Sequence, residues 1–118
     1  MRAKDAVGRY GERVAVRHLR DAGWEVLDTN WRCPDGELDV VARDGDCLVV
    51  VEVKTRRGSA FGSPAEAVTA PKLRRLRRLT ALWITAHDVH APEVRLDVVA
   101  VRVAPRGRAT VEHLVGVG

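Results

Sequence analysis

The sequence predicts an α/β fold, a mixed sheet flanked by helices, because the spacing of apolar residues alternates between two periods. Helical spacing, with an apolar residue at every third or fourth position, runs over residues 4–22 and again over residues 71–86. Runs typical of β-strands lie between and after these segments, and the first covers residues 24–31. The expected order is therefore helix, three strands, helix and two strands, in one domain that spans residues 1–118.

The first helix is expected over residues 4–22, and Gly23 would end it. Glu12 falls at the edge of the apolar stripe of this helix, so it is either a boundary residue or is directed at a ligand. Gly8 and Gly11 carry no side chain, and the helix can therefore approach a neighbouring element closely at these positions.

Residues 36–54 are expected to form two strands joined by a tight turn. Residues 40–42 and 48–53 are rich in β-branched side chains, and Asp44-Gly45 between them is a hairpin signal. Three charged side chains interrupt these apolar strands: Asp39 in the first strand, and Glu52 and Lys54 in the second.

The turn decides on which face of the sheet these charges lie, because side chains alternate along a strand. A two-residue loop that begins at Asp44 would place Asp39 opposite Val50, with Glu52 on the diagonal. A loop that begins at Gly45 would place Asp39 directly opposite Glu52. Either loop brings the two acids and the lysine to one face, whereas a three-residue loop would move one set to the other face.

Two carboxylates that converge beside an ammonium group require an explanation. Like charges directly opposite each other in a sheet are unfavourable, and a buried charge is costly unless it is paired or bound to a metal. A divalent cation would remove the conflict, because Mg²⁺ binds one or two carboxylates together with phosphate oxygens. The alternative is a solvated sheet face with a Glu52–Lys54 ion pair, and these residues alone leave both readings open.

The segment that follows the hairpin is expected to be a loop over residues 55–63. From this loop Arg56 and Arg57 could reach a phosphate backbone, or they could simply be solvated. The second helix, which begins near Pro71, has five basic residues in its first half: Lys72, Arg74, Arg75, Arg77 and Arg78. Positive charge at a helix N-terminus opposes the helix dipole, which favours an anionic partner, although a basic run is usually a solvated face.

Two more strands complete the chain, over residues 93–104 and, at an edge of the sheet, over residues 109–115. The long helix before residues 93–104 is a crossover connection, which makes this strand parallel to the second strand of the hairpin. Arg95 and Asp97 share one face of it and predict a structural ion pair.

Composition points to a polyanionic partner and to the cytoplasm. The 118-residue chain has a net charge of +4 and a pI of about 9.7, although 17 of its 20 basic residues are Arg, a bias that a GC-rich genome also produces. No apolar run approaches membrane-spanning length and no secretory signal is visible, so no membrane partner is expected. Cys33 and Cys47 are expected to be free thiols.

A series of short motifs runs through nearly the whole chain in a characteristic order. They are Gly11-Glu12, Asn30-Trp31-Arg32, Gly36-Glu37-Leu38-Asp39, Val51-Glu52-Val53-Lys54-Thr55-Arg56, Phe61-Gly62-Ser63-Pro64, Lys72 and Arg95-Leu96-Asp97. This set resembles the YraN-type (UPF0102) family of the PD-(D/E)XK nuclease superfamily, small bacterial proteins with a fold like that of Holliday-junction resolvases. Leu96 is a conservative departure, because an aromatic residue is common there.

The resemblance implies a restriction-endonuclease-like α-β-β-β-α-β core and a metal-dependent nuclease that hydrolyses phosphodiester bonds in DNA, with branched or structured DNA as the suggested substrate. It implies that Mg²⁺ or Mn²⁺ would be held by Asp39, Glu52 and the carbonyl of Val53. The catalytic residues implied are Glu12, Asp39, Glu52 and Lys54. The residues expected to bind the nucleic-acid backbone are Arg56, Arg57, Lys72, Arg74 and Arg75.

Two other functions remain open from the sequence. One is an accessory protein for DNA processing, with a nuclease fold and little or no turnover. The other is a protein-interaction module whose basic helix binds an acidic partner. DNA is expected as partner ahead of RNA, and a homodimer would suit a junction substrate.

Overall fold

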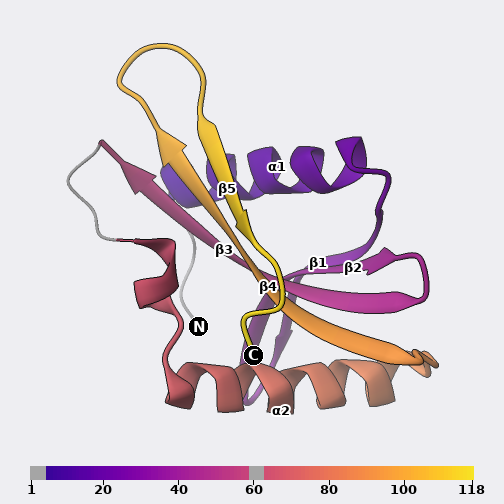
Figure 1. The fold of residues 1–118 in the computed structure, drawn as a ribbon. Helices are drawn as coiled ribbons and strands as arrows, with labels where there is room; N and C mark the ends of the chain where they lie inside the picture. The colour runs from indigo at the N-terminus through magenta and orange to yellow at the C-terminus, as the bar shows by residue number, and fades with distance from the viewer. Residues whose placement is uncertain (1–4, 59–62) are drawn as a thin grey trace.

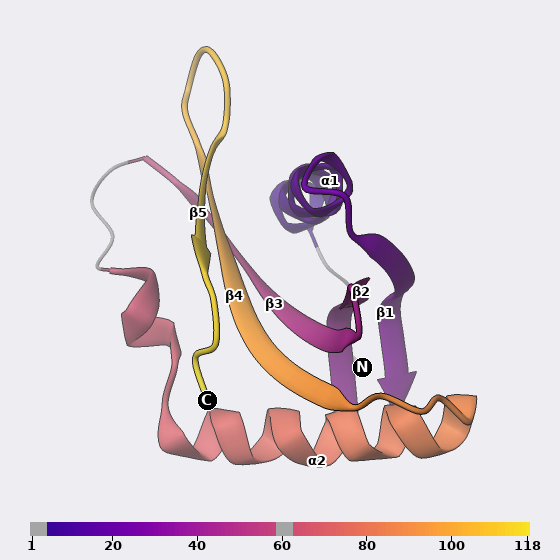
Figure 2. The same cartoon turned by 45° about the vertical axis from the view of Figure 1, so that its right-hand side comes forward.

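Five strands form one mixed sheet that lies between two helices (Figures 1 and 2). The computed structural model describes residues 5–58 and 63–118. In chain order its elements are α1 (Ala6–Asp21), β1 (Glu25–Cys33), β2 (Gly36–Asp44), β3 (Cys47–Arg57), the short 3-10 helix η1 (Pro64–Ala67), α2 (Ala70–His87), β4 (Glu93–Val103) and β5 (Thr110–Leu114). The predicted order of helices and strands is confirmed.

The strands lie side by side in chain order, from β1 to β5. All neighbours are antiparallel except β3 and β4, which are parallel because the long helix α2 carries the chain back to the start of the sheet. The α/β class and the mixed sheet flanked by helices are therefore as the sequence predicts.

Polar side chains cap both helices at their N-termini. The Asp5 carboxylate accepts a hydrogen bond of 2.8 Å from the N–H of Gly8 at the start of α1. The Thr69 hydroxyl accepts one of 3.3 Å from the N–H of Lys72 at the start of α2. Each bond satisfies a backbone donor that has no partner within its helix, and the second fixes Lys72 in the first turn of α2.

The core has two halves because each face of the sheet packs against one helix. Ala15 and Leu19 of α1 cover one half, whose buried strand residues are Val40, Ala42, Cys47, Val49, Val51, Val99 and Val101. Leu76, Leu79 and Trp83 of α2 cover the other half, whose buried strand residues are Leu38, Val41, Leu48, Val50 and Leu96. Successive side chains of β3 alternate between the two faces of the sheet, so each core residue of this strand lies on the side of one helix or of the other.

The β2–β3 hairpin adopts one of the two registers that bring the charges together. Asp44 pairs with Cys47, which leaves Gly45-Asp46 as the two-residue loop. Continued beyond the last observed pair, Val40 with Val51, this register sets Asp39 opposite Glu52. The left-handed backbone of Gly45, with φ 59°, is the conformation that such a tight turn requires.

The expected loop over residues 55–63 is wrong in its first part. β3 continues to Arg57, and residues 55–57 pair with residues 101–103 of β4. Ladder hydrogen bonds to an apolar neighbour strand outweigh the polar character of this segment. The rest of the expected loop includes Phe61-Gly62, which lies outside the described residues.

Two expectations from composition can also be compared with the structure. Within residues 5–58 and 63–118, none of the helices is both long enough and apolar enough to span a membrane. Cys33 and Cys47 are both free thiols, the first partly buried and the second buried. Burial raises the pKa of the Cys47 thiol, which disfavours its thiolate form.

Candidate functional site

An opening in the sheet forms where β2 separates from β3. The ladder between these strands stops at Val40 and Val51. The N–H of Val53, which a longer ladder would direct to the main chain of β2, donates to Asp39 Oδ2 at 2.9 Å instead. In β1, Asn30 lies opposite Asp39 by the register and has a left-handed backbone with φ 54°. A carboxylate thus replaces a ladder carbonyl at the point where the strands diverge.

Glu52 lies next to Asp39 at this opening, on the α2 face of the sheet. Burial, followed by the negative charge of Asp39 and a hydrogen bond to it, raises the pKa of the Glu52 carboxyl above its ordinary value of 4.5. Lys72 acts in the opposite direction, because its Nζ lies 3.5 Å from Glu52 Oε1. Glu52 therefore holds its proton more readily than an isolated carboxyl does.

The main-chain carbonyl of Val53 belongs to the same opening. In an extended strand the N–H and C=O of one residue point to the same side. Since the N–H of Val53 is directed at Asp39, its carbonyl also lies on the side of β3 that faces β2. Two carboxylates and one carbonyl are thus available at the gap between the strands.

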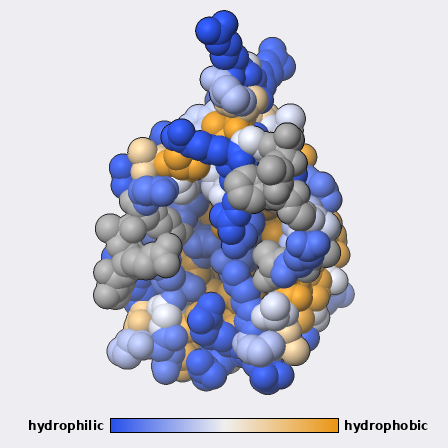
Figure 3. All heavy atoms as spheres, turned by 90° about the vertical axis from the view of Figure 1, so that its left-hand side faces the viewer, coloured by the Kyte–Doolittle hydropathy of each residue, from blue (hydrophilic) through white to orange (hydrophobic). Residues whose placement is uncertain are grey.

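A pocket of about 600 Å³ surrounds this opening, between the N-terminal ends of α1 and α2. Figure 3 views the molecule from this side, where hydrophilic side chains surround a hollow. Seven residues predicted to act at the site line the pocket: Glu12, Asp39, Glu52, Val53, Lys54, Arg56 and Lys72. They come from α1, β2, β3 and α2, so the sequence identified a group that the chain brings together from four elements.

Helix α1 reaches the pocket because Gly11 lets it approach β3. A Cβ atom added at Gly11 would lie 1.8 Å from Thr55 Oγ1, so there is no space for even a methyl group. The expected close approach of this glycine is confirmed. The neighbouring Glu12 is thereby placed at the pocket with only 9% of its surface exposed, and it is not a solvated boundary residue.

Lys54 follows Glu52 on the same face of β3 and lies in a cationic environment. Its pKa is lowered, first by burial and then by the positive charges of Arg56 and Lys72, with Glu52 acting in the opposite direction. A lysine of this kind gives up its proton more easily than an exposed lysine does. It is therefore better suited to a role in proton transfer.

Three predicted residues do not line the pocket. Arg57 is exposed at the end of β3, where alternation directs it away from the face that carries Arg56. Arg74 and Arg75 are exposed on α2. Only Lys72 of the basic run on this helix reaches the pocket, because it lies in the first turn and contacts Glu52.

The donor set at the opening is small for a metal site. Across the two described ranges, no group of three or more His, Cys, Asp or Glu side chains is close enough together to hold a metal ion. Two carboxylates and a carbonyl leave several coordination positions to water or to a phosphate. Mg²⁺ accepts such a site, because it retains waters and commonly binds substrate phosphates.

A second polar cluster lies on the α1 face of the sheet, centred on Asp97. Its carboxylate accepts hydrogen bonds from Arg95 Nε at 2.9 Å, Arg95 Nη2 at 3.1 Å, His113 Nε2 at 2.8 Å and the N–H of Gly116 at 2.9 Å. Nδ1 of His113 lies 3.1 Å from Nε2 of His18, and burial together with His113 lowers the pKa of His18. The predicted Arg95–Asp97 pair is confirmed, but neither histidine gave a sequence signal.

The chain is similar to known proteins along nearly its whole length. The sequence model of an uncharacterised protein family, UPF0102, matches residues 11–101. A protein of Kineococcus radiotolerans is 68% identical over 118 residues, which cover 99% of this chain and 97% of the relative. One of Beutenbergia cavernae is 67% identical over 118 residues, which cover 100% of both chains. One of Streptomyces coelicolor is 56% identical over 119 residues, 99% of this chain and 92% of the relative. The names of these relatives state the family and no activity.

Proposed function

We infer the function of this chain, which belongs to the UPF0102 family, from its own site, and we propose a metal-dependent nuclease of the PD-(D/E)XK superfamily. The proposed reaction is hydrolysis of a phosphodiester bond in DNA, with branched or structured DNA as the preferred substrate. One observation carries the proposal: the carboxyls of Asp39 and Glu52 meet at the opening of the sheet, where burial and the charge of Asp39 raise the pKa of Glu52.

The chemistry of the donors fits Mg²⁺ or Mn²⁺. Asp39, Glu52 and the carbonyl of Val53 would hold the ion, which when bound supplies a Lewis acid for the phosphate and an acidified water. Oxygen ligands suit these hard cations, and the raised pKa of Glu52 supports a need for positive charge at this position.

Two cations in the pocket would hold the scissile phosphate. Lys72 and Arg56 line the same pocket as Glu52, and an ammonium and a guanidinium both donate to phosphate oxygens. Arg57, Arg74 and Arg75 are exposed outside the pocket and would contact the backbone further along the strand. Such contacts give affinity and orientation but read no sequence.

Lys54 and Glu12 would act on the attacking water. The lowered pKa of Lys54 makes its neutral amine more accessible as an acceptor of the proton, while its ammonium form would stabilise charge that develops on the phosphate. Glu12, which is buried and lines the same pocket, would orient water through its carboxylate. Both roles require only groups that already line the pocket.

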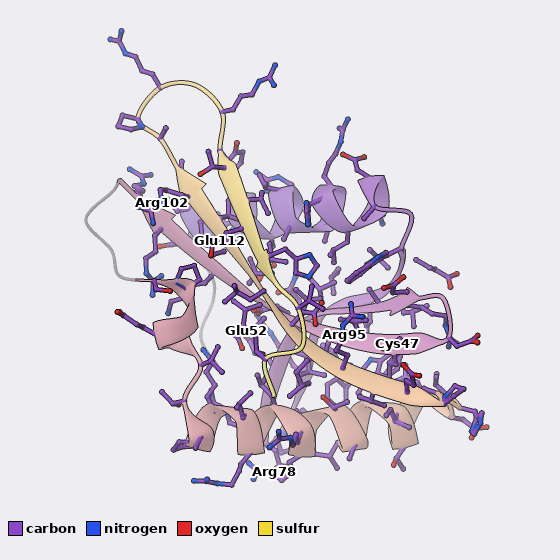
Figure 4. All side chains as sticks on the ribbon, in the orientation of Figure 1. Cys47, Glu52, Arg78, Arg95, Arg102 and Glu112 are labelled. Carbon is purple, nitrogen blue, oxygen red and sulfur yellow. The ribbon has the colours of Figure 1, made fainter. Side chains whose placement is uncertain are left out.

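A panel of structured DNA and RNA substrates in Mn²⁺ tests the proposal. We expect Glu52→Ala to abolish cleavage and Lys54→Ala to reduce it by about 10²-fold or more, the usual size of a general acid–base contribution. Arg78→Ala, on the exposed side of α2, is the matched control and should cleave as the wild type does (Figure 4). Unchanged cleavage by Glu52→Ala would remove the assignment.

The Lys72–Glu52 ion pair favours a second candidate, a nucleic-acid-binding accessory protein without turnover. The ammonium 3.5 Å from Glu52 supplies a positive charge where the cation would otherwise bind. In that case DNA binding should depend on salt but not on Mn²⁺. Under the nuclease proposal, Mn²⁺ should instead strengthen the binding of phosphate near Glu52.

We further propose that the protein acts in the cytoplasm, where the thiols of Cys33 and Cys47 remain reduced. A homodimer would place two copies of the site around a two-fold axis, which suits a symmetric junction. Light scattering with and without junction DNA measures this directly, and a mass that stays at one chain in both samples excludes the dimer.

A further inference from the structure

A second pocket of about 410 Å³ adjoins the candidate site and has no role in the proposed chemistry. It lies between η1 and the β4–β5 end of the sheet. Lys54 and Arg56 line both pockets, so a ligand that fills one extends directly into the other. Figure 4 shows the labelled Arg102 and Glu112 at this end of the sheet, on the strands that lead away from Glu52 and α2.

Strand register explains which side chains meet there. Lys54 pairs with Ala100, and Ala100 with Glu112. One step further along, Arg56 pairs with Arg102, and Arg102 with Thr110. Paired residues share a face, so these two rows continue the face that carries Glu52.

The pairing of Arg56 with Arg102 indicates an anionic ligand. Like charges side by side in a sheet are unfavourable, and here a third cation, Lys54, lies one row away. Arg102 donates to the carbonyl of Gly58 at 3.2 Å, which uses one of the five N–H donors of the guanidinium and holds the group at the rim. A phosphate beside the two guanidinium groups would accept hydrogen bonds from both and would further offset the repulsion.

The other residues that line the pocket do not suit a phosphate. Two carboxylates, Glu66 and Glu112, line it together with the apolar side chains of Pro64 and Ala100. Apolar walls with a few hydrogen-bonding groups are what an unstacked base requires, and a glutamate accepts hydrogen bonds from a base amino group. A volume of about 410 Å³ is that of a small-ligand site and is closed to a duplex.

We propose that this pocket binds an unpaired nucleotide next to the scissile phosphate. Arg102 and Arg56 bind its phosphate, and the base enters between Pro64 and Ala100, where Glu112 accepts a hydrogen bond from its amino group. This rests on the proposed nuclease function and narrows its substrate class to nucleic acid with an unpaired strand at the cleavage point. A fully paired duplex is excluded from the pocket.

Binding without divalent metal tests the pocket independently of cleavage. The probes are a labelled fully paired duplex and the same duplex carrying a single-stranded arm, measured by fluorescence anisotropy in EDTA. We expect Arg102→Ala to weaken binding of the armed duplex about tenfold and to leave the paired duplex nearly unchanged. Arg78→Ala, which removes the same charge on α2, should alter neither (Figure 4). Equal effects of the two substitutions on both probes would overturn the proposal.

The base contact has its own test with oligo-dC and oligo-dT. Cytosine has an exocyclic amino group and thymine has none, so the wild type should bind oligo-dC about fivefold tighter, and Glu112→Leu should abolish that preference. Glu25→Leu removes an exposed carboxylate on β1 and serves as the matched control. This variant should keep the preference for oligo-dC. Equal binding of both oligomers by the wild type would overturn the base assignment.

These measurements separate this proposal from the nuclease proposal. A selective loss of armed-duplex binding in Arg102→Ala supports the pocket even if Glu52→Ala cleaves like the wild type, in which case only the nuclease proposal fails. Loss of cleavage in Glu52→Ala, together with equal binding by Arg102→Ala and Arg78→Ala, leaves the nuclease and removes the pocket.

Discussion

Asp97 and Glu52 are acids on the same sheet with opposite environments. Asp97 lies on the α1 face with no exposed side-chain surface, and four hydrogen bonds from Arg95, His113 and Gly116 reach its two oxygens. Glu52 lies on the α2 face at an open pocket, beside another acid and one lysine at 3.5 Å. The protein supplies four hydrogen-bond donors to the first acid, whereas burial and a neighbouring acid raise the pKa of the second.

The difference separates a structural acid from a candidate functional one. A buried carboxylate with two donors per oxygen is already satisfied and has little to gain from a ligand. A carboxyl whose pKa is raised by burial and by a neighbouring acid gains from any cation that enters. Substitutions that remove the charge should therefore change stability in opposite directions at the two positions.

The largest effect is expected for Asp97→Asn. The substitution keeps the shape but leaves the Arg95 guanidinium without its carboxylate, and breaking such a buried pair costs about 3–5 kcal/mol. Urea unfolding measures the loss. Asp44→Asn is the control, because it removes the more exposed partner of Arg95 at 3.6 Å and should change stability by about 1 kcal/mol at most. Equal losses from the two variants would contradict the assignment of Asp97 as the central acid.

A smaller loss is expected for Gly11→Ala, which separates α1 from the pocket. The added methyl overlaps Thr55, and overpacking of this kind costs up to about 3 kcal/mol, against a gain of about 1 kcal/mol in helix propensity. The net loss should be about 1–2 kcal/mol. Adding Thr55→Ala should recover part of it in a double-mutant cycle, and strictly additive losses would show that the two residues are not in contact.

Glu52→Gln should have the smallest effect on stability, and the effect should be a gain. We expect up to about 1 kcal/mol at neutral pH, which is the scale of a like-charge pair in a sheet. The folded protein binds the Glu52 proton more tightly than the unfolded chain does, because the folded pKa is raised. This contribution is complete below the unfolded pKa near 4.5 and is lost as the pH rises through the raised value. The variant should therefore match the wild type in acid and exceed it above that window. A constant difference at all pH values would contradict this.

Local sequence signals predicted the parts of the site that lie on one hairpin. Asp44-Gly45 and the alternation of valines bring Asp39, Glu52 and Lys54 to one face, because a tight turn permits few registers. Gly11 likewise marked the close approach of α1. These features depend on neighbours in sequence or on the absence of a side chain.

Contacts between distant elements could not be predicted in the same way. His18 and His113 meet at 3.1 Å although 95 residues separate them, and no spacing rule connects them. The ion pair of Lys72 with Glu52 depends on where the first turn of α2 lies over the sheet. β3 extends through Arg56 because this segment pairs with β4. The polar residues before Gly58 give no sign of that pairing in the sequence.

Calorimetric titration with Mn²⁺ tests the central claim, that the opening between β2 and β3 is a cation site. The wild type should bind one ion per chain and release protons on binding, because the ion competes with the proton that the raised pKa of Glu52 favours. Binding should be lost in Glu52→Gln and Asp39→Asn and kept in Arg78→Ala. Absence of binding to the wild type, or unchanged binding by Glu52→Gln, would contradict the claim.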